Sequence, residues 1–179
     1  MKDHIGIDYQ IAGIEILLNE DCIVQRFYPL IQYKDRLSAN LSEKGILTRN
    51  ACAALSDQEL IEAGLPDENM AALFRCFLHL YDYKGKGIKD IPDAECRSAK
   101  EISSLLELMR LPGVKAVRAQ LYLHCGIRSL SDLADADAEQ LRDQIANRIL
   151  QEELPFSAPF LKELRTQIAV AKVFTAYAV

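Results

Sequence analysis

The stretch that decides the fold runs from residue 111 to residue 141 and reads LPGVKAVRAQLYLHCGIRSLSDLADADAEQL. Pro112 and Gly113 predict a tight turn, because proline presets φ and glycine accepts the left-handed conformation that such turns require. Residues 115–125 follow with the apolar spacing of a helix, and Gly126 stands where that helix is expected to end. The predicted apolar face of this helix comprises Val117, Leu121 and Cys125.

Two further helices are expected after Gly126. Ser129 or Ser131 can cap the first of them, and Asp137 can cap the second. The carboxylates of this region could also be read as ligands of a divalent metal, but their regular placement at helix starts favours capping and interaction with the helix dipole. These carboxylates are Asp132, Asp135, Asp137 and Glu139. The stretch as a whole predicts short helices joined by short turns.

Residues 107–143 resemble helix-hairpin-helix domains, and they are especially similar to uncharacterised bacterial and archaeal tandem helix-hairpin-helix domains of unknown function. The similarity lies in Pro-Gly-Val at 112–114, Arg-Ala at 118–119, Leu-Tyr at 121–122 and Gly-Ile-Arg-Ser-Leu-Ser-Asp-Leu-Ala at 126–134. In the nucleic-acid-binding members of the wider superfamily, a Gly-hydrophobe-Gly core turns its backbone N–H groups toward a phosphate. This chain has Lys115 in place of the second glycine, so a side chain stands where the backbone would approach the phosphate.

The resemblance implies contact with the phosphate backbone of nucleic acid at this turn. The backbone N–H groups of residues 113–115 would lie at a helix N-terminus, where the helix dipole favours an anion, and the basic side chains would neutralise phosphates. With about three phosphate contacts, affinity would be modest and would fall steeply with salt. Alternatively, Arg110 and Arg118 belong to a solvated helix face whose charge is balanced by the acidic residues downstream. The predicted nucleic-acid-binding residues are Gly113, Val114, Lys115, Arg118 and Arg110.

The first half of the chain is expected to be helical as well. One helix is expected over residues 8–18 with Asp8 as its cap, and a second is expected to end at Gly45. A third is expected to start at Thr48 or Asn50, and a fourth at the Ser56–Glu59 capping box. A fifth is expected over residues 67–82.

The two halves can be compared at a fixed offset of 81 residues, which places Lys34 on Lys115, Gly45 on Gly126, Thr48 on Ser129, Ala53 on Ala134 and Leu60 on Leu141. The agreement predicts an all-α protein of two tandem helix-hairpin-helix-like (SAM-like) units plus a C-terminal helix. The predicted domains are residues 1–83, a basic Gly-containing linker over residues 84–96, and residues 97–179. The lead helix of the second unit is expected over residues 93–110.

A second interpretation is a protein-interaction module. Residues 52–80 resemble a passage of sterile-alpha-motif domains, which are helical interaction modules. The C-terminal helix is expected over residues 160–177, with Ser157 as cap and Pro159 in the first turn. It would either close the core or contact a partner chain. In the second case, the apolar residues exposed on it would be Val170, Val173 and Val179.

Composition limits the class of protein. The chain has 179 residues and an ordinary globular balance of apolar and charged residues. Its net charge of −5 is opposite in sign to the charge expected of a general nucleic-acid binder. Without an apolar run of about 18 residues or a signal-peptide pattern at the N-terminus, we expect a cytoplasmic protein with no membrane contact. Its five cysteines are far apart and are expected to be buried and reduced.

The sequence offers no pattern for catalysis. It lacks a nucleophile elbow, a phosphate-binding loop, a dinucleotide fingerprint and the spacing of a metalloprotease. His124 and Cys125 are adjacent, but neighbours on a helix point about 100° apart and cannot readily share one ion. We therefore expect a protein without catalytic residues, metal or cofactor, which binds nucleic acid or a protein partner and whose oligomeric state the sequence leaves open.

Overall fold

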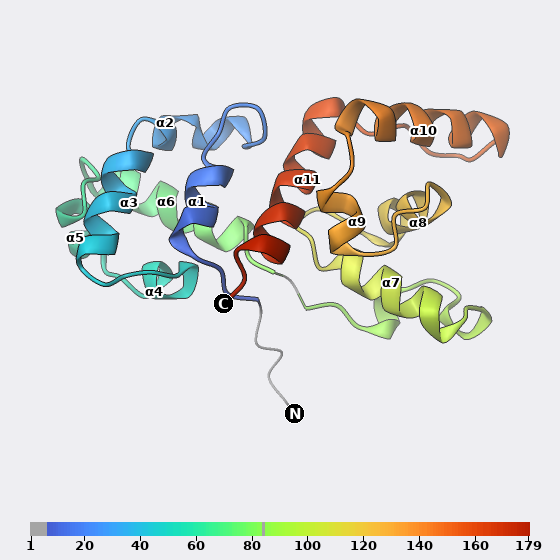
Figure 1. Ribbon diagram of the computed structural model, residues 1–179, viewed down its shortest axis with the longest axis horizontal. Coiled ribbons are helices and arrows are strands. Elements are labelled where there is room, and N and C mark those ends of the chain that lie inside the picture. The colour runs from blue at the N-terminus through green and yellow to red at the C-terminus, as the bar shows by residue number, and fades with distance from the viewer. Residues whose placement is uncertain (1–6, 84) are drawn as a thin grey trace.

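The computed structural model describes residues 7–83 and 85–179, and it confirms the all-α class (Figure 1). Residues 1–6, at the start of the predicted first unit, and Lys84, at the start of the predicted linker, lie outside the described residues. The helices of the first half are α1 (Ile11–Leu17), α2 (Tyr28–Ile31), α3 (Lys34–Glu43), α4 (Arg49–Ala53), α5 (Asp57–Glu62) and α6 (Glu68–Leu80). Those of the second half are α7 (Ala99–Met109), α8 (Ala116–His124), α9 (Leu130–Ala134), α10 (Ala138–Gln151) and α11 (Leu161–Ala176). Short 3₁₀ turns are η1 (Gln25–Phe27), η2 (Ile88–Asp90) and η3 (Ala94–Cys96).

Helix α6 supplies the aromatic part of the core of the first half. Its buried residues recur at helical spacing, so one face of the helix is apolar. The Phe77 ring lies edge-on to Phe27 at 5.7 Å between centroids and is 4.9 Å from the ring of Tyr81. Aromatic pairs in such tilted arrangements contribute about 0.5–1.5 kcal/mol beyond their buried area. Helices α4 and α5 pack against α6, and α3 packs against α1.

The predicted caps of the first half are confirmed with one exception. Thr48 Oγ1 accepts from Ala51 N at the start of α4, and Ser56 forms the predicted capping box with Glu59. Asp8 does not cap α1, which begins after Gln10. Its Oδ1 instead accepts from Asn50 N at 3.0 Å, so this carboxylate stabilises the N-terminal end of α4.

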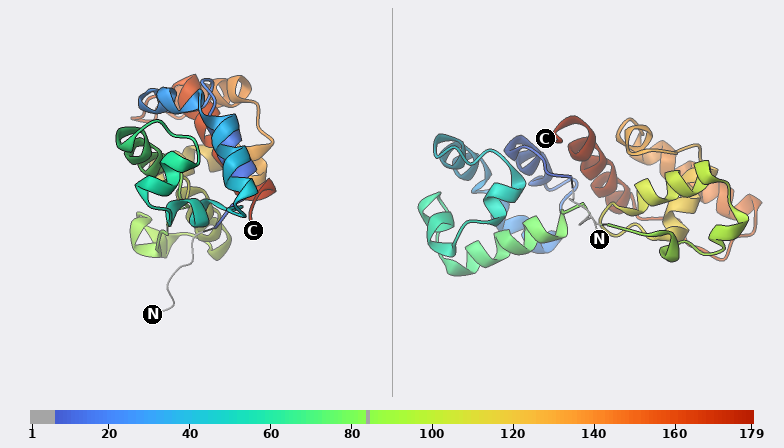
Figure 2. Two further views of the ribbon diagram at one scale, coloured as in Figure 1. Left: turned by 90° about the vertical axis from the view of Figure 1, so that its left-hand side faces the viewer. Right: turned by 90° about the horizontal axis from the view of Figure 1, so that it is seen from below.

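The C-terminal helix lies between the two halves of the chain. Helix α11 packs against α9 and α10 in its own half and against α1 of the first half (Figures 1 and 2). Val170 and Val173 are 1% and 0% exposed, so the prediction that they mark a contact surface is wrong. Helix α11 closes the core, and of the three predicted contact residues only Val179, beyond its end, is exposed.

The boundaries of two predicted helices also change. Helix α7 begins at Ala99 rather than at residue 93, because Asp93 has a left-handed φ of 52° and η3 intervenes before Ser98 caps the helix. Helix α11 begins after Phe160 without a side-chain cap, so Ser157 is not its cap and Pro159 precedes its first turn. The predicted linker contributes to the core, since Ile91 is buried.

The two halves meet at a seam between α1 and α11. Gly13 of α1 lies so close to α11 that a Cβ at this position would be 2.6 Å from Val173 Cγ1. The ring of Phe174 lies 5.7 Å from that of Tyr9 and 5.2 Å from that of Tyr83. Buried apolar residues on both sides form one continuous cluster. The seam is therefore part of the core.

The described end of the chain is tied to the segment before α1. Gln10 N donates to Tyr177 O at 2.8 Å, and Val179 N donates to Asp8 O at 3.0 Å. The same segment bonds to the entry of α4, where Arg49 N donates to Tyr9 O at 2.8 Å. These bonds satisfy backbone groups that a helical protein would otherwise leave unpaired between its elements.

Local geometry recurs 81 residues apart in the two halves. Gly45 follows the C-cap residue of α3 and Gly126 follows that of α8, with φ values of 75° and 83°. In each case the next residue closes a Schellman motif: Ile46 N donates to Leu41 O at 2.9 Å, and Ile127 N donates to Tyr122 O at 3.0 Å. Helices α4 and α9 then begin at equivalent positions, as do α5 and α10. These are correspondences of punctuation, and the tandem arrangement stays a prediction.

Candidate nucleic-acid interface

The predicted turn joins α7 to α8 and is open at its tip. Leu111 and Val114 are 1% exposed and fix the two ends of the turn, whereas Gly113 and Lys115 between and after them are exposed. Gly113 has a φ of 77°, which a residue with a Cβ adopts only with strain. Apart from Gly113 itself and its two chain neighbours, no described residue has an atom within 4 Å of the place where its Cβ would be. The hairpin tip, defined as residues 112–115, therefore presents backbone and one lysine to solvent.

The N-terminus of α8 differs from those of α9 and α10. Its N-cap is Lys115, whose side chain caps no backbone N–H, and its first turn contains no acidic residue. In α9 and α10, by contrast, Ser129 and Asp137 accept from backbone N–H groups and acidic residues stand in the first turn. The partial positive charge of the α8 N-terminus is thus left without a side-chain acceptor, and it can attract an anion.

Arg118 does not belong to the exposed tip. Its Nη2 lies 3.2 Å from Glu163 Oε1 of α11, and its side chain is only 19% exposed. Its Nη1 is buried and has no hydrogen-bond partner among the residues that the structure describes. Next to it, the Tyr122 hydroxyl donates to Gln167 Oε1, and burial raises the pKa of this tyrosine. Arg118 therefore connects α8 to α11 and is not available to a phosphate.

Arg110 is also held within the protein. Its Nη1 donates to the Tyr83 hydroxyl at 3.2 Å, and its guanidinium lies 5.3 Å from the centroid of the same ring. Such a cation–π contact stabilises by about 0.5–2 kcal/mol. The structure thus leaves Gly113 and Lys115 of the predicted site exposed at the tip and places both arginines in contacts with other elements. Val114 is buried and its backbone N–H donates to Leu111 O at 3.2 Å, so neither its side chain nor its N–H is open to a phosphate.

The apolar face of α8 is rotated from the predicted one. Val117 is 41% exposed, and Cys125 is only partly buried. The helix instead buries Ala116, Ala119 and Tyr122, which recur at a spacing of three, together with Leu121. The two alanines allow neighbouring helices to approach closely, which periodicity of large apolar residues alone does not indicate.

An apolar cavity of about 420 Å³ adjoins the hairpin tip. Pro112 and Gly113 form one side of it, and Ile23, Leu80 and Tyr81 of the first half form another. Lys162 lies at its edge, with Nζ 4.5 Å from the centroid of the Tyr28 ring. Residues of both halves therefore line the cavity beside the tip.

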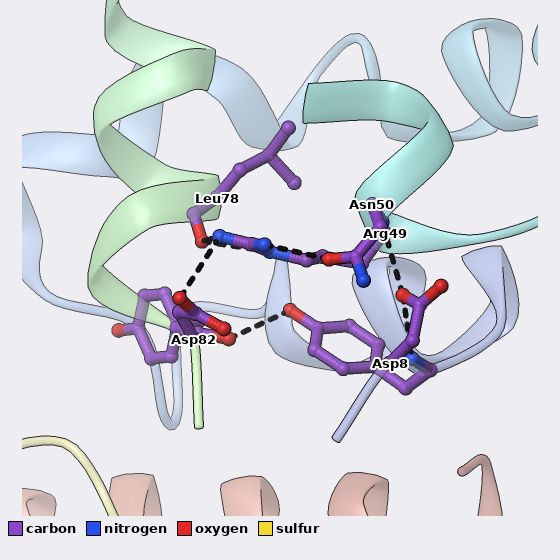
Figure 3. Close-up of polar contacts among 7 residues, drawn as sticks. Asp8, Arg49, Asn50, Leu78 and Asp82 are labelled. Carbon is purple, nitrogen blue, oxygen red and sulfur yellow. Dashed lines mark hydrogen bonds and ion pairs between the residues drawn. The ribbon is translucent and has the colours of Figure 1, made fainter. Parts of the chain in front are cut away.

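The first half contains a buried arginine that sequence reasoning missed (Figure 3). Arg49 Nε and Nη2 donate to Leu78 O at 3.2 and 2.8 Å, and Nη1 donates to Asn50 Oδ1 at 2.8 Å. Asp82 Oδ2 lies 3.5 Å from Nη2. The guanidinium thus supplies partners to a carbonyl in the last turn of α6. Every nitrogen of this group is engaged, so the cluster is structural. The only sequence signal was an arginine directly after a helix cap.

Cysteines and carboxylates offer no further site. Among residues 7–83 and 85–179, no group of three or more His, Cys, Asp or Glu side chains could hold a metal ion. Asp137 accepts from Glu139 N and Gln140 N, as a helix cap does. The expectation that all thiols are buried is wrong, since the side chains of Cys76 and Cys96 are exposed. Burial raises the pKa of Cys52 to about 12. In the same part of the chain, no helix is long and apolar enough to cross a bilayer.

The second half of the chain matches a known family model. Residues 85–173, which include the hairpin tip and most of α11, match the family model described as a domain of unknown function, DUF4332. The predicted similarity of the second half to a domain of unknown function is confirmed to this extent, and the helix-hairpin-helix assignment stays a prediction. Searches of curated proteins and of solved structures found no match.

Proposed function

We propose that this chain is a non-enzymatic binding protein that contacts the phosphate backbone of nucleic acid through its hairpin tip. In this proposal, two helix-hairpin-helix-like units stand in tandem, and only the second makes the contact. The observation that carries the proposal is the open tip, where an exposed Lys115 and an α8 N-terminus with no side-chain cap and no acidic residue occur together. A phosphate at this place would receive backbone N–H groups and one ammonium group.

The engagement of the two arginines within the protein lowers the affinity expected for nucleic acid. Because Arg110 and Arg118 are engaged with Tyr83 and Glu163, the described part of the tip retains one free cation in place of three. Each neutralised phosphate adds about −0.9 to the slope of log K against log salt concentration. We therefore expect a slope near −1 per tip and an affinity at the weak end of non-specific binding, with a Kd on the order of 10⁻⁴ M.

The test is an NMR titration of the ¹⁵N-labelled chain with duplex and with single-stranded DNA at about 50 and about 200 mM salt. Backbone amides of residues 113–118 are expected to shift, more at low salt, and Lys115→Glu is expected to abolish the shifts. Lys115 is exposed, so the spectrum of this variant should otherwise remain that of the folded protein.

The matched control is Lys34→Glu, which changes the lysine at the equivalent position of the first half. Lys34 is the first residue of α3, where no Pro-Gly turn precedes the helix. The proposal expects this variant to bind DNA as the wild type does. Absence of amide shifts at low salt, or equal losses in both variants, would contradict a contact at the tip.

A second candidate function is binding of a protein partner, and a different surface favours it. Leu150 at the end of α10 is 76% exposed, and Phe160 directly before α11 is 82% exposed. Phe156, in the segment between them, is 38% exposed. Large apolar side chains that gather on a short exposed segment are characteristic of interaction sites. The expected contact surface of the protein-interaction alternative therefore lies at residues 150–160 rather than on α11.

This candidate is tested with a photo-cross-linking residue at position 160 in the full chain. A defined cross-linked protein that disappears with Leu150→Ser would support it. A cross-linker at Leu47, which is 56% exposed in the first half, controls for non-specific contact. Equal cross-linking from both positions would argue against an interaction surface at residues 150–160.

A further inference from the structure

A cleft lies between α7 and α8 at the end of the hairpin that is remote from its tip. Helices α7 and α8 lie side by side (Figure 1). Residues of the N-terminal end of α7 and of the C-terminal end of α8 line the cleft. It has a volume of about 400 Å³, within the range of small-molecule sites. Helix α8 has nine residues, so roughly 14 Å separate this cleft from the tip. The cleft is therefore a separate place on the molecule.

Basic side chains dominate the walls of the cleft. Lys100 comes from the first turn of α7, and Arg128 comes from the turn that follows α8. Both are exposed, and within residues 7–83 and 85–179 neither side chain forms an ion pair. Two unpaired cations from different elements thus face one cavity. Unlike the arginines near the tip, they are free to bind a ligand.

The acidic residue in the lining does not cancel this charge. Glu101 Oε1 lies 2.5 Å from Arg97 Nη1, and Arg97 also donates through Nε to Pro92 O at 3.2 Å. This pair is neutral in sum and fixes the guanidinium at the wall. His124 also lines the cleft, and its Nδ1 is 3.5 Å from Oε2 of Glu152, the residue that follows α10. The net charge presented to the cavity is therefore set by Lys100 and Arg128.

Neutral groups complete the cavity in a way that suits a phosphate ester. Ser104 and Gln120 offer hydrogen-bond donors. Leu123 gives an apolar wall against which an organic group can pack. A bare anion would leave much of this space unfilled, whereas a phosphorylated molecule of about nucleotide size would not.

We propose that this cleft binds the phosphate group of a small phosphorylated ligand. Lys100 and Arg128 would neutralise the dianion, and the guanidinium of Arg128 can donate two parallel hydrogen bonds to its oxygens. Ser104 and Gln120 would bind the remaining oxygens or the organic part. The site is independent of the hairpin tip and of the function proposed for it.

The test is isothermal titration calorimetry of the full chain with AMP and with pyrophosphate, and with adenosine as the probe that lacks phosphate. AMP or pyrophosphate is expected to bind and adenosine is not. The double variant Lys100→Gln/Arg128→Gln is expected to weaken binding at least about tenfold, because it removes two charged hydrogen-bond donors. Both residues are exposed, so the fold should persist, and an unchanged far-UV CD spectrum checks this.

Two further variants identify the site. Lys89→Gln/Lys172→Gln removes two exposed lysines elsewhere and controls for net charge. Lys115→Gln changes only the hairpin tip, so loss of DNA binding with intact AMP binding separates the two proposals. Binding by neither phosphate probe, equal binding of AMP and adenosine, or full binding by the Lys100→Gln/Arg128→Gln variant would overturn the cleft proposal.

Discussion

Replacing Gly13 by alanine should destabilise the protein, although alanine is the better helix former. At an unstrained helical position the replacement favours the helix by about 0.5–1 kcal/mol. Gly13, however, is buried at the seam between α1 and α11, and the new Cβ would lie 2.6 Å from Val173 Cγ1 and 2.9 Å from Tyr9 Cδ2. Carbon atoms in optimal contact are about 3.5–4.0 Å apart. The seam must therefore open by roughly an ångström.

The magnitude follows from two opposing terms. Overpacking a well-packed core by one methyl group costs about 1–3 kcal/mol, and the gain in helix propensity offsets up to about 1 kcal/mol of this. We expect a net loss of about 1–2 kcal/mol in the free energy of unfolding. Ala12→Gly, at the preceding and partly exposed position of α1, measures the propensity difference within the same helix.

A double-mutant cycle with Val173→Ala tests the cause. Val173→Ala alone should cost about 2 kcal/mol, since it removes two buried methyl groups. In the double variant the methyl group introduced by Gly13→Ala occupies part of the space that Val173 leaves, so the combined loss should be about 1 kcal/mol smaller than the sum. The free energies come from urea unfolding followed by far-UV CD. A stabilised Gly13→Ala variant, or strictly additive losses, would refute the close approach of α1 and α11 and with it the shared core.

Three further outcomes are expected. Arg49→Ala should lower the free energy of unfolding by about 2–4 kcal/mol in urea unfolding, since it leaves the Leu78 carbonyl unpaired within the core; a loss below about 1 kcal/mol would contradict that role. Hydrogen bonds from Ser56 lower the pKa of Glu59 in the folded state, so this carboxylate stabilises the protein above its unfolded pKa, and that contribution is lost as the pH falls through the folded pKa. Ser56→Ala should raise the pKa of Glu59 in an NMR titration, and loss of the N-cap hydroxyl should cost about 1 kcal/mol of stability at neutral pH; an unchanged pKa of Glu59 would show that the capping box is absent. A thiol reagent should modify the native protein fast at the exposed cysteines and slowly at Cys52, whose raised pKa disfavours the thiolate; equal rates by mass spectrometry would contradict this burial. The exposed thiols are those of Cys76 and Cys96.

Much of the local structure was determined by the sequence alone. The caps at Thr48, Ser129 and Asp137 and the C-terminal glycine at Gly126 all stand where the residue pattern places them. A cap depends on hydrogen bonds between residues two to four apart, and a left-handed turn depends on the absence of one Cβ. Such features involve no distant part of the chain, so the order of residues is sufficient to predict them.

The candidate site was predictable only in part. The sequence indicated the turn, the exposed Lys115 and the helix that follows. It also placed Arg118 one turn from Lys115, on the same stretch of helix, which is correct as local geometry. It could not indicate that Glu163 would lie 3.2 Å from Arg118 or that Tyr83 would lie under Arg110. A long basic side chain can reach several directions, and distant residues decide which of them is taken.

Tertiary structure alone decided which faces are buried and how closely helices approach. Val170 and Val173 are buried because α11 packs against α1 and α9. The sequence of α11 does not specify which helices pack against it. The close contact at Gly13 likewise exists only because α11 crosses α1 there. The physical reason is one of range: caps and turns are decided by neighbours along the chain, whereas burial and ion pairing are decided by neighbours in space.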